Sequence, residues 1–422
     1  MNVLSSLERR LESLAGPVEL AKPRFDVEPV PLVAPRSIDE ARELLRFAAA
    51  DGLRVLPLGR GSKLGWCGIP GQIDFALSTR RLTRVVSHVP ADGTITVEAG
   101  VLVSELRERC RAGGHFLTPD VPRPGSRTIG GVVAAGESGL DRLRFGPVRH
   151  HVLGTKVVLA GGALAKSGGQ LVKNVTGYDL HRLYCGSHGT LALIVEVSLR
   201  LFPEPEHEVL LAAPAADARG AFEMARRALA LPLRTVSLTL EPDETGRWLA
   251  VARLFGLRAA VEAERARLAS EWPLHRAFEG SFARAEAERR RDAAPGASPE
   301  RASLRATCPP SRVEEALAVL LQTLQSARLA PRALVQPGVA AIEVELAAEP
   351  LDSDSLARIA ANLRTALARH EASLSLRNAP RAALAALDPF GASAPGLELM
   401  RAIQRQLDPS GVFRTGRFHG GL

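Results

Sequence analysis

The feature that most constrains this chain is a set of glycine-rich segments in its N-terminal half. The first, PLGRGSKLG, runs from Pro57 to Gly65 directly after a short predicted strand. Its three glycines can adopt positive φ, so that consecutive backbone N–H groups converge on one point. Such a nest binds an anion, and a pyrophosphate is the usual guest. Within it, Arg60 or Lys63 would add charge and Ser62 a hydroxyl donor.

The second segment, Pro124 to Gly139, packs five glycines into sixteen residues among small and β-branched side chains. A backbone of this composition can lie flat against a ligand ring or a phosphate. Taken alone, the first segment also fits a glycine-rich turn between strands, and the second fits a buried tight loop. Two such segments within one half of the chain favour a ligand over two unrelated turns.

A third motif comprises Lys173–Leu180 and Cys185–Ile194, with Tyr178, Asp179 and His188 as polar residues beside a long predicted strand. A turn into an edge strand explains this motif equally well. Several other sites are excluded. A Walker-type loop would need glycines at positions 160 and 165, which are alanines, and neither HExxH nor GxSxG is present. The first segment is not GxGxxG, so a Rossmann dinucleotide site gains little support.

Composition narrows the possible partners. A chain of 422 residues is expected to form two domains or three lobes. The net charge of +8 suggests nucleic acid, but aromatic residues are scarce at 4% and the arginines are spread over the whole chain. The four cysteines form no CxxC, so a disulfide framework, a zinc site and an iron–sulfur cluster are not expected. No segment resembles a signal peptide or a membrane span, and a cytoplasmic location is expected.

The hydrophobic pattern divides the chain near Pro203–Pro205. In the first half we expect a helix that begins at Ser37 and ends at Asp51-Gly52, a second helix over 104–112, and glycine-rich loops over 124–139 and 161–169. We expect strands there over 55–58, 94–97, 152–159 and 191–201. In the second half we expect helices over 217–230, 258–271, 312–326, 353–370 and 397–406. Its expected strands are 209–213, 235–240, 249–254 and 341–346, with a charged low-complexity stretch over 281–303. The fold class is therefore α+β.

Taken in order, these motifs resemble a known family. GRGSK at 59–63, TIGG at 128–131, FGPVR at 145–149, GYDL at 177–180 and GSHGT at 186–190 resemble the FAD-binding domain of the vanillyl-alcohol oxidase / p-cresol methylhydroxylase (PCMH) superfamily. DPSGVF at 408–413, followed by TGR at 415–417, resembles the closing motif of its D-lactate dehydrogenase and glycolate oxidase branch. The resemblance is specific over about residues 24–204 and 385–420.

The resemblance implies an α+β architecture with a PCMH-type two-subdomain FAD-binding domain, an α+β cap domain and a C-terminal return segment. The expected boundaries are 1–23 for an N-terminal helix, 24–204, 205–385 and 386–422. FAD would be bound non-covalently, since residues 59–65 contain no histidine. The residues expected to contact FAD are Gly59, Arg60, Gly61, Ser62, Lys63, Pro119, Asp120, Thr128, Gly130, Gly131, Gly136, Gly189 and Ile194.

The departures from the family are informative. Catalytic members of this branch carry an HxGDGNxH-type metal motif in the cap, whereas residues 206–385 contain only His207, His275 and His370, so no metal site is expected. Val132 and Gly136 stand where the family often has asparagine. A short flavin-binding chain without the metal motif resembles the smaller FAD-binding subunit of glycolate oxidases. That subunit works beside a larger flavoprotein subunit and an iron–sulfur subunit, through which it would reach the inner membrane peripherally.

The implied activity is oxidation of a 2-hydroxy acid, glycolate to glyoxylate, with electrons leaving through the iron–sulfur partner. His188 or His419 would be the base, and Arg149, Arg414 or Arg417 the carboxylate ligand, but position alone supports them and no catalytic residue is assigned. Two alternatives stay open. In the first, the chain is a stand-alone FAD-dependent oxidoreductase of another hydroxy acid or alcohol. In the second, it is a non-catalytic electron-relay subunit, and the missing metal motif favours this second alternative.

Overall fold

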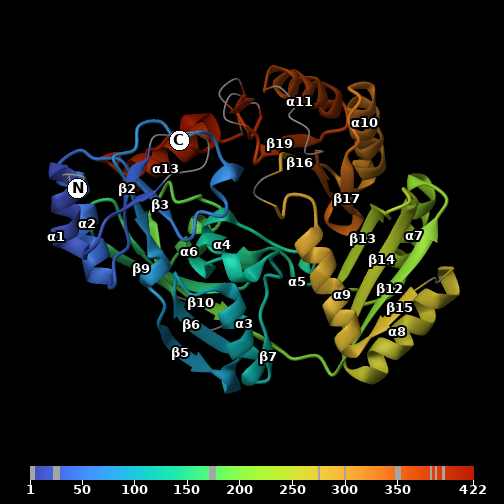
Figure 1. Ribbon diagram of the computed structural model, residues 1–422. Helices are drawn as coiled ribbons and strands as arrows, with labels where there is room; N and C mark the ends of the chain where they lie inside the picture. Colours follow the sequence, from blue (N-terminus) through green and yellow to red (C-terminus); the bar gives the residue numbers. More distant parts are fainter. Residues whose placement is uncertain are drawn as a thin grey trace.

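The structure is a computed structural model that describes residues 5–21, 29–170, 177–273, 276–298, 301–346, 353–380, 383–384, 387–391 and 395–422. It has two lobes (Figure 1). The N-terminal half and the C-terminal tail form the first lobe, and the cap forms the second, with helix α9 (Gly280–Ala293) between them. The mixed architecture confirms the expected α+β class.

The first subdomain is built on a four-stranded sheet of order β1-β2-β4-β3, in which β2, β4 and β3 run parallel. Its strands are β1 (Glu19–Ala21), β2 (Val30–Val33), β3 (Val55–Leu58) and β4 (Phe75–Ser78). Helices α1 (Ser6–Ala15) and α2 (Ile38–Ala50) pack on it. Helix α2 begins as predicted, since the Ser37 side chain accepts a hydrogen bond from the Glu40 N–H at 3.1 Å. Its last residue is Ala50, and Asp51 is its C-cap, in agreement with the predicted end at Asp51-Gly52.

The second subdomain is a five-stranded antiparallel sheet of order β5-β6-β10-β8-β9. Its strands are β5 (Val85–Val89), β6 (Thr94–Glu98), β8 (Val152–Val158), β9 (Leu164–Gly168) and β10 (Leu193–Arg200). Its helices are α3 (Val103–Ala112), α4 (Ile129–Ala135), α5 (Arg142–Phe145) and α6 (Leu180–Tyr184). A two-stranded ribbon of β7 (His115–Phe116) and β11 (Phe202–Pro203) lies beside them.

The two glycine-rich loops expected in this half are more regular than the sequence suggested. Residues 124–139 contain helix α4, because Thr128 caps its N-terminus by accepting from the Gly131 N–H at 3.3 Å and Gly136 ends it with φ +62°. Residues 161–169 contain strand β9, which lies at the sheet edge and pairs with β8 alone. An edge strand needs no continuous apolar run, which explains why the pattern missed it.

The cap is one eight-stranded antiparallel sheet of order β15-β12-β14-β13-β17-β18-β16-β19. Each half follows the order β-α-β-β-α-β, and the halves join where β13 meets β17, at Leu240 opposite Val335. The first half contains β12 (His207–Ala215), α7 (Ala218–Ala230), β13 (Ser237–Pro242), β14 (Trp248–Gly256), α8 (Arg258–Glu271) and β15 (Arg276–Glu279). The second contains β16 (Ser303–Thr307), α10 (Val313–Ser326), β17 (Arg332–Gln336), β18 (Ala341–Glu345), α11 (Ser353–Ala368) and β19 (Ser373–Arg377).

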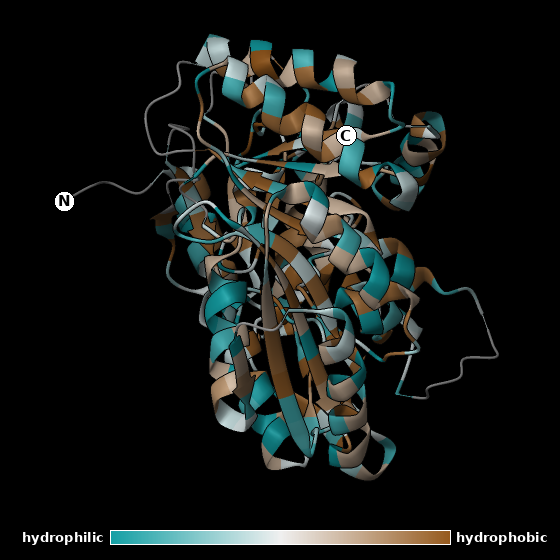
Figure 2. Cartoon of the chain, turned by 90° about the vertical axis from the view of Figure 1, so that its right-hand side faces the viewer, coloured by the Kyte–Doolittle hydropathy of each residue, from teal (hydrophilic) through white to brown (hydrophobic). Residues whose placement is uncertain are grey.

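The two faces of the cap sheet differ. One face packs against α7, α8, α10 and α11 in a single apolar core, and Figure 2 shows apolar strands running between helices whose visible surfaces mix polar and apolar residues. The other face is crossed by α9 over β12. The sequence does not predict β16, β17 or β19, because each has only five residues, too few for the hydrophobic pattern to separate a strand from a turn.

Most of the stretch expected to be low-complexity, 281–303, is helix α9 instead. Ala283 and Ala287, four residues apart, are buried on one helix face against Leu210, Ala212 and Val251. The arginines and glutamates between them hide this apolar stripe in the sequence, because two alanines contribute little to an average hydropathy. None of the helices in the described ranges is both long and apolar enough to cross a membrane.

The C-terminal tail returns to the first subdomain. Helix α13 (Leu397–Leu407) is followed by Asp408, which is fully buried and accepts hydrogen bonds from the backbone N–H groups of Val412 and Phe413, both at 2.8 Å. Val412 in turn accepts from the Val55 N–H at 2.8 Å, and Phe413 fills the core beside α2. The tail is therefore an integral part of the first lobe.

We predict that Asp408→Ala destabilises the fold by about 2–4 kcal/mol, because two buried backbone N–H groups lose their acceptor. Urea unfolding followed by circular dichroism measures this change. Asp39→Ala is the control, since Asp39 is exposed and pairs with Arg42 within α2, and its effect should stay within about 0.5 kcal/mol. Equal effects of the two substitutions would contradict the anchoring role of Asp408.

Candidate functional site

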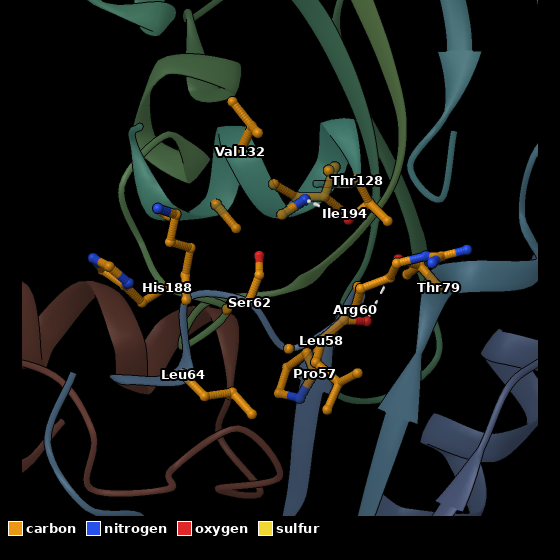
Figure 3. A pocket seen from close by; sticks show the side chains of 18 of the residues that line it. Pro57, Leu58, Arg60, Ser62, Leu64, Thr79, Thr128, Val132, His188 and Ile194 are labelled. Carbon is orange, nitrogen blue, oxygen red and sulfur yellow. Dashed lines mark hydrogen bonds between the residues drawn. The ribbon is translucent and has the colours of Figure 1, made fainter. Parts of the chain in front are cut away.

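One cavity lies between the loop after β3, helix α4 and the start of β10 (Figure 3). The figure shows Thr128 and Val132 on one side and Ser62 and Leu64 on the other, with His188 at one end and Thr79 at the opposite end. The glycine-rich segments thus meet, although they lie far apart in the sequence. The lining residues are 57–64, Cys67, Thr79, Arg127, Thr128, 130–132, Ala134, Ala135, Glu137, His188, Gly189, 192–194 and Arg417.

Ten of the residues expected to bind the cofactor line this cavity. They are Gly59, Arg60, Gly61, Ser62, Lys63, Thr128, Gly130, Gly131, Gly189 and Ile194. Pro119, Asp120 and Gly136 do not. The Asp120 carboxylate pairs with Arg107 at 3.0 Å and with Arg291 of α9 at 2.9 Å. It lines a different cavity, which lies beside Arg107, Arg253 and Arg291. Gly136 ends α4 and lies against the backbone of Gly186.

The first loop departs from the expected nest of three positive-φ glycines. Gly61 has φ +72°, but Gly59 and Gly65 do not have positive φ. They are glycines because neighbours come too close for any side chain. A Cβ on Gly59 would lie 1.9 Å from Thr128 Oγ1, and one on Gly65 would lie 2.3 Å from Asn378 Oδ1. The loop therefore packs directly on the start of α4, and its backbone forms the cavity floor.

A buried group of charges closes one part of the cavity. Lys63 Nζ lies 2.5 Å from Glu137 Oε1, and Arg127 Nε lies 3.7 Å from Glu137 Oε2. Burial lowers the pKa of Lys63 to about 7, although the Glu137 carboxylate opposes this shift. Lys63 Nζ also lies 3.7 Å from the centre of the Trp66 ring, which Arg377 of the cap contacts at 3.8 Å. These contacts join the cavity wall to the second lobe.

His188 and Cys67 lie together in the lining, with Sγ 3.0 Å from Nδ1. Burial, followed by the nearby charge of Arg417, lowers the pKa of His188 to about 3, and burial raises the pKa of the Cys67 thiol. Both groups are therefore neutral near pH 7, and His188 is a weak base there. The sequence did not single out Trp66, Cys67 or Glu137 as residues of the site. Their positions offered a signal, because Trp66 and Cys67 directly follow the first glycine-rich segment and Glu137 lies inside the second.

The remaining candidates from the sequence are spread out. Arg149 and Arg414 are exposed. Arg417 lines the cavity, but its guanidinium donates to the carbonyl groups of Leu64 at 2.7 Å and Gly68 at 3.4 Å, so it holds the first loop. The His419 ring lies 4.2 Å from that of Phe390, outside the lining.

Two features lie away from this cavity. In the third motif, Tyr178 is exposed and Asp179 pairs with Arg182, while Lys173–Thr176 lie outside the described residues. In the described part of the chain, one group of side chains has ligand atoms close enough for a metal ion, namely His207, Glu262 and Glu279. It lies on the cap, and Arg265 already pairs with both glutamates. Of the third motif, only its second part, Cys185–Ile194, contributes described residues to the cavity, through His188, Gly189 and residues 192–194.

Comparison with known proteins agrees with this geometry. Residues 29–168 match the FAD binding domain family. Glycolate oxidase subunit GlcD from Bacillus subtilis is 33% identical over 193 residues, 46% of this chain and 41% of that protein. D-2-hydroxyglutarate dehydrogenase from Xanthomonas citri pv. viticola is 34% identical over 196 residues, 46% and 42% of the two chains. D-lactate dehydrogenase from Archaeoglobus fulgidus is 32% identical over 243 residues, 53% and 54% of the two chains.

The chain thus spans about half or less of the length of these curated relatives. Among solved structures, alkyldihydroxyacetonephosphate synthase superposes with a TM-score of 0.66 at 14% identity, over 92% of this chain and 77% of that one. This likeness extends over both lobes and concerns the fold. Residues 29–168 are an FAD-binding domain, and FAD is the cofactor of this chain.

Proposed function

We propose that this chain is the FAD-binding subunit of a glycolate oxidase/dehydrogenase-type complex that oxidises a 2-hydroxy acid, glycolate to glyoxylate. Electrons would pass through its flavin to an iron–sulfur partner. The observation that carries the proposal is the cavity formed by the glycine-rich segments of an FAD-binding domain, in a chain whose similar proteins are named for glycolate, D-lactate and D-2-hydroxyglutarate.

The residues of the cavity fit FAD. The backbone of residues 59–63 would hold the pyrophosphate, with Lys63 and Arg60 supplying positive charge. The absence of a side chain at Gly59 brings this loop against Thr128, and the small residues of α4 leave room for a flat ring. Arg417 keeps the first loop in place through its hydrogen bond to the Leu64 carbonyl. When bound, FAD supplies a two-electron acceptor for the hydride of the substrate.

The proposed partners follow from what the chain lacks. Its four cysteines are all free and lie in different parts of the fold, so iron–sulfur clusters would belong to another subunit. The similar protein from Bacillus subtilis is itself named as a subunit. The partners proposed here are therefore a larger flavoprotein subunit and an iron–sulfur subunit.

A second candidate function is electron relay without substrate oxidation by this subunit. Two observations favour it. His188, which lines the cavity, has a pKa lowered to about 3, and residues 206–385 lack the histidine-rich metal motif of catalytic members. A relay subunit needs a bound flavin but no base.

We predict that Gly61→Val abolishes FAD retention. A β-branched residue at φ +72° is strained, and its Cβ would lie 3.2 Å from Leu64 Cδ1 inside the loop. Flavin absorbance per protein after gel filtration measures the loss. Gly52→Val is the matched control, since Gly52 has φ +66° with no atom within 4 Å of its Cβ position and lies outside the cavity. Full FAD retention by Gly61→Val would show that the first loop is misassigned.

A further prediction concerns the pH dependence of FAD binding. Because burial lowers the pKa of Lys63 to about 7, Lys63 is protonated below pH 7 and attracts the pyrophosphate most strongly there. The Kd of FAD should therefore rise about tenfold between pH 6 and pH 8. Lys63→Met should bind weakly and lose this pH dependence. Lys156→Met, which breaks a lysine–glutamate pair with Glu196 outside the cavity, should keep it. Identical pH profiles for the wild type and Lys63→Met would exclude this role.

The third prediction tests the function. We expect the purified chain to be yellow, and glycolate added anaerobically to bleach its flavin only when its native partners are present. Bleaching of the chain alone would instead show a stand-alone oxidoreductase. A complex that carries Gly61→Val tests the relay function. If glycolate still bleaches the flavin of the partner subunit but no longer reduces the iron–sulfur clusters, electrons reach the clusters through the flavin of this chain, and the relay function is favoured. If the purified chain is colourless and does not bind added FAD, the whole proposal is overturned.

A further inference from the structure

Four leucines line a groove on the surface where the first lobe meets the cap. Leu143 belongs to α5 of the first lobe, Leu229 to the end of α7 in the cap, and Leu231 and Leu233 to the loop before β13. Leu229 is 43% exposed. An apolar groove with a polar rim on a folded protein is typical of a site that binds another molecule. The other lining residues are Arg144, Ala228, Arg234 and Thr235.

The backbone beneath the groove fixes its shape. A Cβ on Gly338, in the short turn after β17, would lie 2.5 Å from Leu143 Cδ1 and 3.2 Å from Leu229 Cδ2, so these two leucines rest on bare backbone. The Leu233 N–H donates to the Leu231 carbonyl at 2.7 Å, which closes a three-residue turn and sets the spacing of the other two leucines. A groove whose walls are already ordered loses little conformational entropy when a partner binds.

The rim of this leucine groove is positively charged. Arg144 and Arg234 are both exposed there, and the Arg144 guanidinium donates to the Arg234 carbonyl at 2.6 Å. The charges that act on Arg144 come from Arg234 and Glu264. A Glu264 carboxylate oxygen already accepts from the Arg234 N–H at 3.1 Å. Two guanidinium groups therefore stand against one carboxylate, and this excess of positive charge favours an acidic partner.

An acidic amphipathic helix matches both the leucines and the charged rim. Apolar side chains three or four residues apart on such a helix fill an apolar groove, and carboxylates that flank them reach the arginines. An extended segment would instead need an open sheet edge, and β13, the strand that follows the groove, is paired on both sides, with β14 and β17. A second copy of this chain is disfavoured by charge, because each copy carries a net charge of +8.

We propose that the leucine groove is the docking site for an acidic amphipathic helix of another protein chain. The identification of that chain with a partner subunit rests on the proposed function, whereas the helix and its charge follow from the groove. Leu143 and Arg144 belong to the first lobe, and the other lining residues belong to the cap. A helix seated here therefore contacts both lobes and holds them in one relative position.

The first test is titration of the FAD-loaded full chain with a labelled, stapled helical peptide of about fifteen residues. The peptide carries leucine at every third or fourth position and glutamate elsewhere. Fluorescence anisotropy should give a Kd of about 10 μM or lower. A peptide with lysine in place of glutamate should bind at least about tenfold more weakly, and added salt should weaken the acidic peptide.

Two variants locate the binding. Leu229→Glu and Arg234→Glu should each weaken the acidic peptide about tenfold or more, because they add negative charge to the groove and its rim. Leu257→Glu and Arg219→Glu are the matched controls. Leu257 is 65% exposed at the start of α8, Arg219 pairs with Glu223 within α7, and neither lines the groove, so both variants should bind as the wild type does.

Circular dichroism and flavin absorbance show whether each variant is folded. Leu229 and Arg234 are exposed, so substitutions there should leave the fold intact. If a glutamate variant does not fold, Leu229→Ser and Arg234→Gln replace the two variants and should weaken the acidic peptide about threefold.

The second test is gel filtration of the chain with its native partners. Leu229→Glu should elute without the subunit that accompanies the wild type and Leu257→Glu. The proposal is overturned if the wild type does not bind the acidic peptide, or if Leu229→Glu and Arg234→Glu bind it as the controls do. Self-association of the wild type that Leu229→Glu abolishes would overturn it too, because a second copy would then occupy the groove.

The docking site and the proposed function can fail separately. Groove-dependent binding of the acidic peptide, in a chain whose flavin glycolate does not bleach even beside the native partners, would reject the proposed function and keep the docking site. A complex that carries Leu229→Glu, retains all its subunits and is still bleached by glycolate would reject the docking site and keep the function.

Discussion

The contact between Gly59 and Thr128 is the constraint on which the cofactor cavity depends. The backbone of the first loop comes so close to Thr128 Oγ1 that no side chain fits at position 59. The same hydroxyl oxygen caps α4, and the Gly59 carbonyl accepts a hydrogen bond from Ser78 Oγ at 2.7 Å. One close approach therefore ties β3, β4 and α4 together. The two subdomains meet at this point, and the floor of the cavity takes its shape from it.

Buried charges connect this cavity to the cap. Charged side chains removed from water are costly unless they are paired, and here they form a continuous series. Lys63 pairs with Glu137, Trp66 contacts both Lys63 and Arg377, and Arg377 shares Glu343 with Arg305. The series leads from the cofactor cavity to charged residues of the cap sheet.

A second set of ion pairs fixes how the lobes meet. Arg291 of α9 binds Asp120, and Arg253 of the cap binds Asp141 at 2.8 Å. The Arg127 guanidinium also donates to the Ala297 carbonyl, at 3.3 Å. Asp120, which the resemblance implies lies along the cofactor, pairs with Arg291 and so joins the first lobe to α9. The cavity lined by Trp66 and Arg377 depends on this contact, because α9 supplies one of its walls.

The sequence alone determined the α+β class, the FAD-binding domain and ten of the residues that meet in one cavity, because glycine-rich motifs are local and their order along the chain is specific. The sequence did not distinguish the reasons for two of the glycines. Gly61 is required by its positive φ, whereas Gly59 is required because Thr128 lies too close for a side chain, and the residue type is the same in both cases. Only the tertiary structure decided that Asp120 faces Arg291, 171 residues away in the chain, and that Arg305, Gln336 and Arg377 line one cavity. Such contacts depend on how β-strands pair and lobes dock, and neither is encoded in a short stretch of sequence.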